Sequence, residues 1–270
     1  MASTAYPIAQ SGSFNFGNTI NIIIETAAAI YETPISDTTG SANGSADAQK
    51  KGVRGLTTAN IIAEGHLELE SNGTEAVAQS GDFTSSGDAA AIHVHQWVLQ
   101  KTWPLFDVTG SSAGSKDAIK QWRHGLPVVK GSVVGVGKSD LGAQLDFAAE
   151  LSESTLTFDI NQFGILAGNV IIKEKRISAP FKIGGPIGAA LSFQFNGVAS
   201  TWTPTGTQYT WLYPSGAANA LGGDPSRGTL TLDIDTSTNI VESAICYHVE
   251  IRNPSAIGGK VPVRAAFRLD

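Results

Sequence analysis

The stretch "DTTGSANGSADAQKKGVRGL" at residues 37–56 returns 70 positions later as "DVTGSSAGSKDAIKQWRHGL" at residues 107–126. Eleven of the 20 aligned positions are identical, whereas unrelated segments of ordinary composition would share about one or two. The match extends beyond these segments, because Gly65 lies over Gly135 at the same offset. A repeat of this length indicates that one structural unit occurs twice in the chain.

A second repeat lies in the C-terminal half of the chain. "TLTFDI" at residues 155–160 matches "TLTLDI" at residues 229–234, an offset of 74. The alignment runs on without a gap and holds 12 identities in 41 positions, including Pro180 over Pro254. Both copies of the first repeat precede both copies of the second, so the two units do not follow one another in simple tandem.

This order predicts that one domain is inserted into a loop of the other. Insertion at a loop tip costs little, because the entropy of loop closure grows slowly with loop length. We expect an inserted domain at residues 88–200 and an outer domain formed by residues 1–87 and 201–270. The polar segments 71–88 and 201–208 would be the linkers. Interleaved pairing of the four segments is the alternative.

Alternation of apolar and polar residues dominates the chain and predicts strands. It is clear at "AIHVHQWVL" (91–99), "VVKGSVVGVG" (128–137) and "AICYHVEIRN" (244–253). The stretch "DLGAQLDFAAELSES" (140–154) instead has helical spacing, with Asp140 as its N-cap. The prediction is a mainly β protein with two related small β-sandwich or barrel domains, each flanked by one short helix.

Composition excludes several classes of protein. The 270-residue chain has a net charge of −6, so it lacks the basic surplus that tight binding to duplex nucleic acid needs. Its one cysteine, Cys246, rules out an internal disulfide framework, and we expect it to be buried in a strand. The first residues show no secretory signal. The most apolar stretch, residues 20–31, is too short to span a membrane and carries Glu25, so we expect a soluble intracellular product.

The candidate chemical motifs are weak. "GVGKS" ends a stretch that resembles a phosphate-binding loop, but the glycine required five places before Gly137 is replaced by Ser132. His93 and His95 share one face of a predicted strand, yet the sequence places no third metal ligand beside them. We therefore expect no catalytic centre, no cofactor and no metal.

The inserted unit resembles the tail-tube protein family of long-tailed bacteriophages. The resemblance rests on the order of short motifs: a tryptophan-containing strand ending in "DVTG" (93–110), "WRHGL" (122–126), "GSVVGVG" (131–137), the helical stretch, and a strand block closed by "FQFNG" (168–197). It covers residues 88–200 well. The outer unit departs from the pattern, because Gly52 stands where the inserted unit has a tryptophan.

The resemblance implies a structural protein of the virion tail that assembles in the host cytoplasm and is not an enzyme. In this family, sheets of neighbouring domains join into a barrel around a lumen, and stacked rings conduct DNA without sequence-specific binding. Six domains close such a ring, so three two-domain chains would form a pseudo-hexamer, and six chains are the alternative. The implied partners are further copies of the chain and other tail proteins, with no membrane.

The long repeated segments would then serve as arms that reach neighbouring subunits or rings. We expect these contacts at Asp37, Gly40, Gly55, Asp107, Gly110, Trp122 and Gly125. Two other functional classes stay open. A capsid-decorating, tail-completion or hub protein would share the composition and form a single ring or surface trimer. A β-sandwich carbohydrate-binding module would need a cleft lined by aromatic and paired acidic residues, and the sequence displays no such cluster.

Overall fold

The computed structural model describes residues 11–16, 20–37, 52–68, 81–86, 88–110, 120–137, 153–159, 164–178, 186–196, 201–204, 227–233, 239–253 and 260–269. The regular elements in these ranges are all β-strands, which confirms the predicted mainly β class. None of them includes a helix long and apolar enough to cross a membrane. The helix expected at 140–154 lies outside the described residues, apart from the strand residues at its end.

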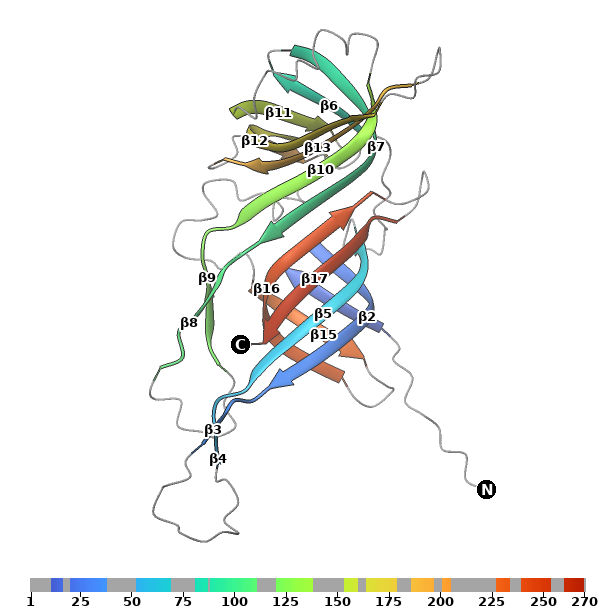
Figure 1. The fold of residues 1–270 in the computed structure, drawn as a ribbon. Coiled ribbons are helices and arrows are strands. Elements are labelled where there is room, and N and C mark those ends of the chain that lie inside the picture. The colour runs from blue at the N-terminus through green and yellow to red at the C-terminus, as the bar shows by residue number, and fades with distance from the viewer. Residues whose placement is uncertain are drawn as a thin grey trace, which may run out of the picture.

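Six strands close into one antiparallel circuit, here called the outer barrel, in the order β1-β2-β5-β17-β16-β15 (Figure 1). Its strands are β1 (Ser11–Phe16), β2 (Ile20–Glu32), β5 (Thr58–Glu68), β15 (Arg227–Asp233), β16 (Asn239–Arg252) and β17 (Pro262–Leu269). Because β15 pairs back with β1, the circuit has no open edge along its shared length.

A second closed circuit has the order β6-β7-β10-β13-β12-β11. It is here called the inner barrel, because its strands lie between those of the outer barrel along the sequence. Its strands are β6 (Gly81–Ser86), β7 (Asp88–Thr102), β10 (Val128–Gly137), β11 (Glu153–Asp159), β12 (Gly164–Ser178) and β13 (Gly188–Phe195). The short β14 (Thr201–Pro204) pairs with β12. Partly exposed and buried positions alternate along β13, as they do in a strand with one face in a core.

The strand bounds recur at the offsets of the two sequence repeats. The first residue of β6 lies 70 residues after the first residue of β1. The last residue of β13 lies 74 residues before the last residue of β17. Two strands fall in the segments predicted to be linkers, since β6 lies within 71–88 and β14 within 201–208. Both are paired with neighbours, so residues 81–86 and 201–204 are strand residues, and the inner barrel includes residues before residue 88.

One strand pair joins the two barrels into a single sheet system (Figure 1). Residues 98–102 of β7 pair antiparallel with residues 248–252 of β16, here called the junction. The chain thereby contains a continuous antiparallel path of eight strands, β12-β13-β10-β7-β16-β17-β5-β2. This path begins in one barrel and ends in the other.

A glycine lies beside a bulge in each barrel. The β2–β5 register shifts at Glu25, and the β7–β10 register shifts at His95. A Cβ atom on Gly65 would lie 1.8 Å from the carbonyl oxygen of Ile23, and one on Gly135 would lie 2.1 Å from that of His93. No side chain fits at either distance, so both bulges require glycine.

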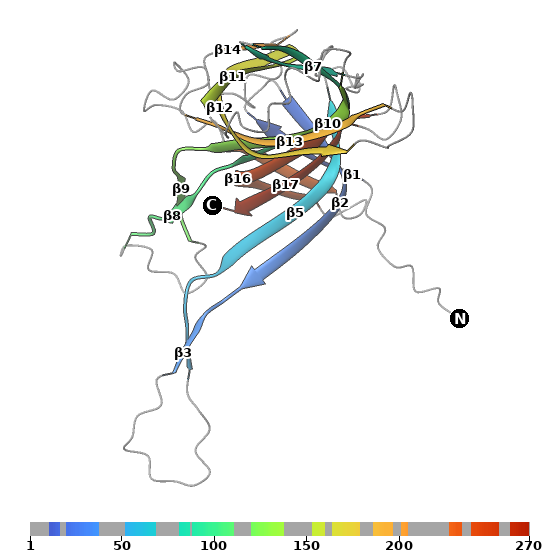
Figure 2. The same cartoon turned by 45° about the horizontal axis from the view of Figure 1, so that its top comes forward.

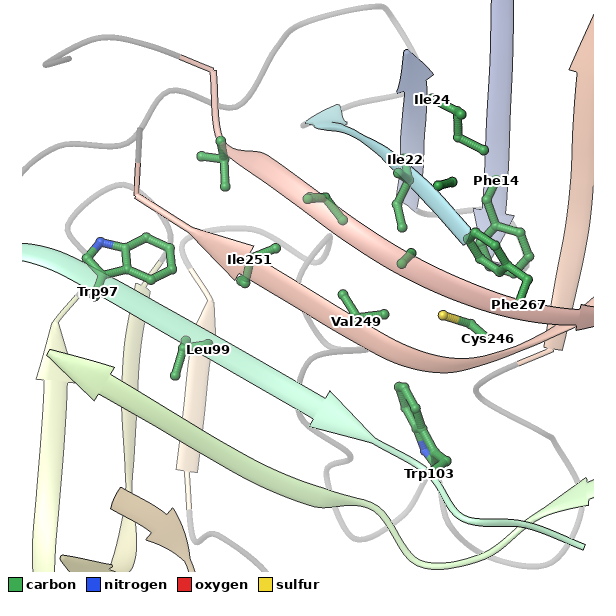
Figure 3. Packing of buried hydrophobic residues seen from close by; sticks show 14 of the residues in the cluster. Phe14, Ile22, Ile24, Trp97, Leu99, Trp103, Cys246, Val249, Ile251 and Phe267 are labelled. Carbon is green, nitrogen blue, oxygen red and sulfur yellow. The ribbon is translucent and has the colours of Figure 1, made fainter. Parts of the chain in front are cut away.

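The cores consist of the inward residues of both barrels and meet at the junction (Figure 3). In the outer barrel, the rings of Phe14 and Phe267 lie 4.3 Å apart between their centroids. Cys246 is fully buried in β16, as predicted from the sequence. Trp97 and Leu99 of β7 are buried where β7 runs beside β16. The junction is therefore part of the hydrophobic core as well as a backbone ladder.

Lys101 is a buried charge at this junction. Its residue is 2% exposed, and its Nζ atom lies 4.6 Å from the centroid of the Trp103 ring. Burial lowers the pKa of Lys101 to about 7, and the nearby Cys246 opposes this only in part. Burial also raises the pKa of the Cys246 thiol, so it stays protonated. Near neutral pH the core therefore holds a lysine that readily loses its charge.

We expect the stability of the unassembled chain to rise with pH above about 7. The unfolded chain keeps the Lys101 proton up to its ordinary pKa, whereas the folded chain releases it near pH 7. Between pH 7 and pH 10 the free energy of unfolding should increase by up to about 4 kcal/mol. Lys101→Met should flatten this dependence in urea titrations, and Lys130→Met at an exposed site serves as the control. An unchanged pH dependence in Lys101→Met would contradict the assignment.

Candidate assembly surfaces

Two short hairpins project from the barrels, one from each (Figure 2). The first arm consists of β3 (Ile35–Asp37) and β4 (Gly52–Arg54), and the second arm of β8 (Leu105–Asp107) and β9 (Trp122–His124). Each arm is a two-stranded antiparallel sheet of its own. In both overall views the arms leave the barrels toward the same side.

Each arm begins with the same glycine–proline contact. The amide of Gly55 donates to the carbonyl oxygen of Pro34, and the amide of Gly125 donates to that of Pro104, both at 2.7 Å. A Cβ atom on either glycine would lie 2.9 Å from the Cγ atom of its proline. The predicted contact residues Gly55 and Gly125 therefore have a local role, because they allow the two strands of each arm to approach closely.

The arms expose apolar side chains. Ile35 is 76% exposed and Val53 54% in the first arm, and Phe106 is 58% exposed in the second arm. Leu126 follows the second arm and is 83% exposed. Apolar groups gathered on a projecting element are typical of a surface that contacts another protein. These four side chains are thus available for contact with another protein, and contact at the predicted glycines stays a prediction.

Asp107 stabilises the end of the second arm that lies farther from the barrel. Its carboxylate accepts a hydrogen bond from the Thr109 amide at 3.0 Å and lies 2.9 Å from Lys120 Nζ. The hydrogen bonds from Thr109 and Lys120 lower the pKa of Asp107 to about 2. Thr109 in turn accepts a hydrogen bond from the Gln121 amide at 2.9 Å. The "DVTG" turn thus links the two strands of the arm.

Trp122 is packed within its own chain. It is 9% exposed, and the guanidinium carbon of Arg268 lies 4.2 Å from its ring centroid. Its carbonyl oxygen accepts a hydrogen bond from Arg227 at 3.3 Å. Since Arg227 and Arg268 belong to β15 and β17, Trp122 fastens the second arm to the outer barrel. Direct contact of Trp122 with a neighbouring chain, as expected from the sequence, stays a prediction.

For the other predicted contact residues the structure gives fewer contacts. Asp37 pairs with Gly52 within the first arm. Gly110 is exposed at the end of the described part of the second arm. Gly40 lies outside the described residues. The segment before β9 also contacts the residue before β5, because the Lys120 amide donates to the Thr57 carbonyl oxygen at 3.2 Å.

The eight-strand path ends at β2 and β12. Residues 26–32 of β2 pair with β5, and residues 172–178 of β12 pair with β13. Within the part of the chain that the structure describes, neither segment has a second partner strand. Residues 25–32 of β2 are all exposed, and they include Ile30 at 46% and Tyr31 at 56%. Such an edge offers unpaired backbone groups and apolar side chains together.

The polar face of the eight-strand path carries charges of both signs. Arg264 lies 3.6 Å from Glu64, and Arg176 lies 3.7 Å from Glu174. Arg252 pairs with Glu250. Partial burial would raise the pKa of Glu250, but hydrogen bonds from Arg252 and Gln100 lower it below its ordinary value. Each of these arginines therefore has a carboxylate beside it.

The motifs considered for chemistry prove to be strand residues. Ser132 and Gly137 lie in β10 and are paired within the sheet, so they do not form a phosphate-binding loop. The exposed rings of His93 and His95 lie 5.2 Å apart, on the same side of β7 as predicted. Among the described residues, no group of three or more His, Cys, Asp or Glu side chains is arranged to hold a metal ion.

Comparisons with known proteins give distant structural similarity only. No protein-family model and no curated protein matches the sequence. A chain from the virion of a native gene transfer agent particle is 18% identical with a TM-score of 0.30, and the match covers 48% of this chain and 87% of that one. A chain from the tail of an empty particle of this kind, refined with sixfold symmetry, is 19% identical with a TM-score of 0.30 over 49% of this chain and 88% of that one. A TM-score of 0.30 is too low to establish a shared fold.

Proposed function

We propose that this chain is a structural protein of a phage tail, whose copies join by their sheets into rings that stack into a tube. The observation that carries the proposal is the eight-strand path, whose two end strands each have an edge without a second partner among the described residues. An edge of this kind favours pairing with another strand, and closure into a ring is the arrangement that satisfies both ends. The order of tail-tube motifs in residues 93–197 supports the same assignment.

The proposed ring contains three chains. We take residues 81–204 and the two flanking segments as two copies of one tube domain, supported by strand bounds that keep the offsets of 70 and 74. Six such domains would close the ring, and the β7–β16 junction would replace every second contact between subunits. The result is a trimer with pseudo-sixfold symmetry. Six chains per ring, with one barrel of each chain outside the tube wall, is the alternative.

The arms are proposed to contact the next subunit or the next ring. They leave the barrels toward one side and expose Ile35, Val53, Phe106 and Leu126. Trp122 sets the position of the second arm by fastening it to the outer barrel. The first arm has Gly52 at the corresponding place and lacks this tryptophan. We therefore assign the more fixed contact to the second arm.

The polar face of the eight-strand path is proposed to line the lumen. DNA would be retained there by cations that are free to replace its counterions. Arg176, Arg252 and Arg264 each have a neighbouring glutamate, which reduces their attraction for phosphate. This arrangement suits a conduit that DNA passes without being held. The same sheet in a hub or decorating protein would form one ring only, so filament formation separates these alternatives.

The first prediction from this proposal is the mass of the smallest ring. Native mass spectrometry of purified protein should give a closed species of three chains, and electron microscopy should show rings that stack into tubes. A ring of six chains would mean that one barrel of each chain lies outside the tube wall. A protein that stays monomeric at all concentrations would contradict the proposed function.

The second prediction concerns the second arm. Leu126→Asp should abolish stacking while leaving the chain folded, because it places a charge on a side chain that is 83% exposed in the unassembled chain. Trp122→Ala should also impair assembly, because the arm loses its attachment to the outer barrel. Leu105 lies in the same arm and is only partly exposed, so Leu105→Ile serves as a conservative control. Unchanged tubes in both Leu126→Asp and Trp122→Ala would show that the arm has been assigned to the wrong contact.

A further inference from the structure

The halves of β7 and β16 that form the junction have counterparts in β2 and β12, which have no second partner strand within the described residues. Strand β7 serves two neighbours on one side: its first half pairs with β6, and residues 98–102 pair with β16. Strand β16 does the same, pairing first with β15 and then, through residues 248–252, with β7. On this side, the first half of each strand pairs within its own barrel, and the second half pairs with a strand of the other barrel.

The sequence offsets locate the corresponding halves of β2 and β12. An offset of 70 carries residues 98–102 to residues 28–32, and an offset of 74 carries 248–252 to 174–178. The register shifts recur at the same offset as well. The register of β16 with β17 shifts at Tyr247, and that of β12 with β13 shifts at Lys173, 74 residues earlier. The two edges therefore have the backbone course of the two strands that meet at the junction.

Burial differs between the paired and unpaired copies. In β7, Trp97 is 2% exposed and Leu99 is 4% exposed, because β16 and the adjoining core cover them. The corresponding residues of β2, Ala27 and Ala29, are exposed. The run "AAAIY" at residues 27–31 thus presents five successive apolar residues on an edge strand. Edges of this kind are rare in proteins that stay monomeric, which usually protect them with charge or proline.

We propose that residues 28–32 of one chain pair with residues 174–178 of a second copy, in the antiparallel register of the internal junction. This inference rests on the proposed ring for closure and adds to it the identity of the two edges and their alignment. The expected backbone pairs are Ala28 with Ser178, Ala29 with Ile177, Ile30 with Arg176, Tyr31 with Lys175 and Glu32 with Glu174. Because β2 and β12 are the two ends of one path, the contact is head-to-tail and propagates until the ring closes.

The junction between chains would be weaker than the internal one. Internally, Asn253 accepts a hydrogen bond from the Trp97 amide at 2.9 Å, donates its own amide to the Trp97 carbonyl oxygen at 3.1 Å, and donates a side-chain hydrogen bond to the His95 carbonyl oxygen. The residue 74 positions before Asn253 is Ala179, which has no hydrogen-bonding side chain. Dissociation of the ring should therefore leave each two-barrel chain intact.

Side-chain pairs across the two junctions also differ. The internal pair Thr102 and His248 is joined by a hydrogen bond of 2.9 Å, and burial lowers the pKa of His248. The corresponding residues between chains are Glu32 and Glu174, which carry like charges. Like charges directly opposite one another destabilise a strand pair. In this register, changing the charge of Glu32 or Glu174 should change the stability of the contact between chains. Another alignment of the same edges would not place these two residues opposite each other.

Disulfide trapping tests the register. Two double variants, Ala29→Cys with Ile177→Cys and Ile30→Cys with Arg176→Cys, place cysteines at directly opposite positions. Hydrogen-bonded and non-hydrogen-bonded pairs alternate along an antiparallel ladder, so one variant has the closer Cβ atoms that a disulfide requires. Ala29→Cys with Arg176→Cys is the off-register control. Buried Cys246 is common to all three and to the parent chain, which serves as the background.

At least one in-register variant should give covalent oligomers up to the size of the ring under mild oxidation, and the control should remain monomeric on non-reducing gels. Rings in the microscope without in-register cross-links would overturn the edge assignment and leave the proposed function standing. In-register cross-links without tubes would uphold the pairing and remove the tube function. Absence of both rings and cross-links would overturn the inference.

A charge exchange gives a second, independent readout. Glu32→Lys should raise the urea concentration at which rings dissociate, because it converts the like-charged pair into an opposite pair with Glu174. Adding Glu174→Lys to that variant should reverse the gain. Glu242→Lys, at an exposed position on the paired half of β16, is the control and should leave the dissociation midpoint unchanged. Equal effects of Glu32→Lys and Glu242→Lys would show that Glu32 does not face Glu174.

Discussion

The backbone ladder between β7 and β16 is the contact on which the organisation of this molecule depends. Without it, the described strands would form two separate closed barrels. With it, four strands of each barrel line up into one antiparallel path. A closed circuit satisfies the backbone groups along its shared length, but strands longer than their neighbours extend past the closure. In this chain the extensions of β7 and β16 pair with each other. The extensions of β2 and β12 have no second partner strand among the described residues.

The sequence predicted the parts of this arrangement that depend on local pattern. Alternation predicted β7, β10 and β16, and some strand bounds recur at the offsets of the two repeats. Strand β6 was missed because "GDFTSS" is polar and was taken for a linker. A signal was present, since "SGSF" at residues 11–14 resembles "SGDF" at residues 80–83. In the structure, Phe14 pairs with Ile22 of β2 and Phe83 with Ile92 of β7.

Apart from Trp122, the predicted contact residues are positions identical in both copies of the repeat, and the structure gives several of the predicted residues an internal contact. Gly55 and Gly125 allow a close backbone approach to a proline, and Asp107 closes a turn. Trp122 is covered by Arg268, a residue 146 positions away that no local pattern connects with it. The unpaired edge at residues 27–31 was also missed. Its run of apolar residues without alternation was the available signal, because a strand with one solvated face would alternate.

Hydrogen exchange at the two edges tests the central claim most directly. In the dissociated chain, amides of residues 28–32 that point away from β5 and those of residues 174–178 that point away from β13 should exchange rapidly, while residues 98–102 stay protected by β10 and β16. On assembly both edges should become protected together, to a degree approaching that of the internal junction. Persistence of rapid exchange at either edge in assembled rings or tubes would contradict the account, because the copies would then associate through other surfaces.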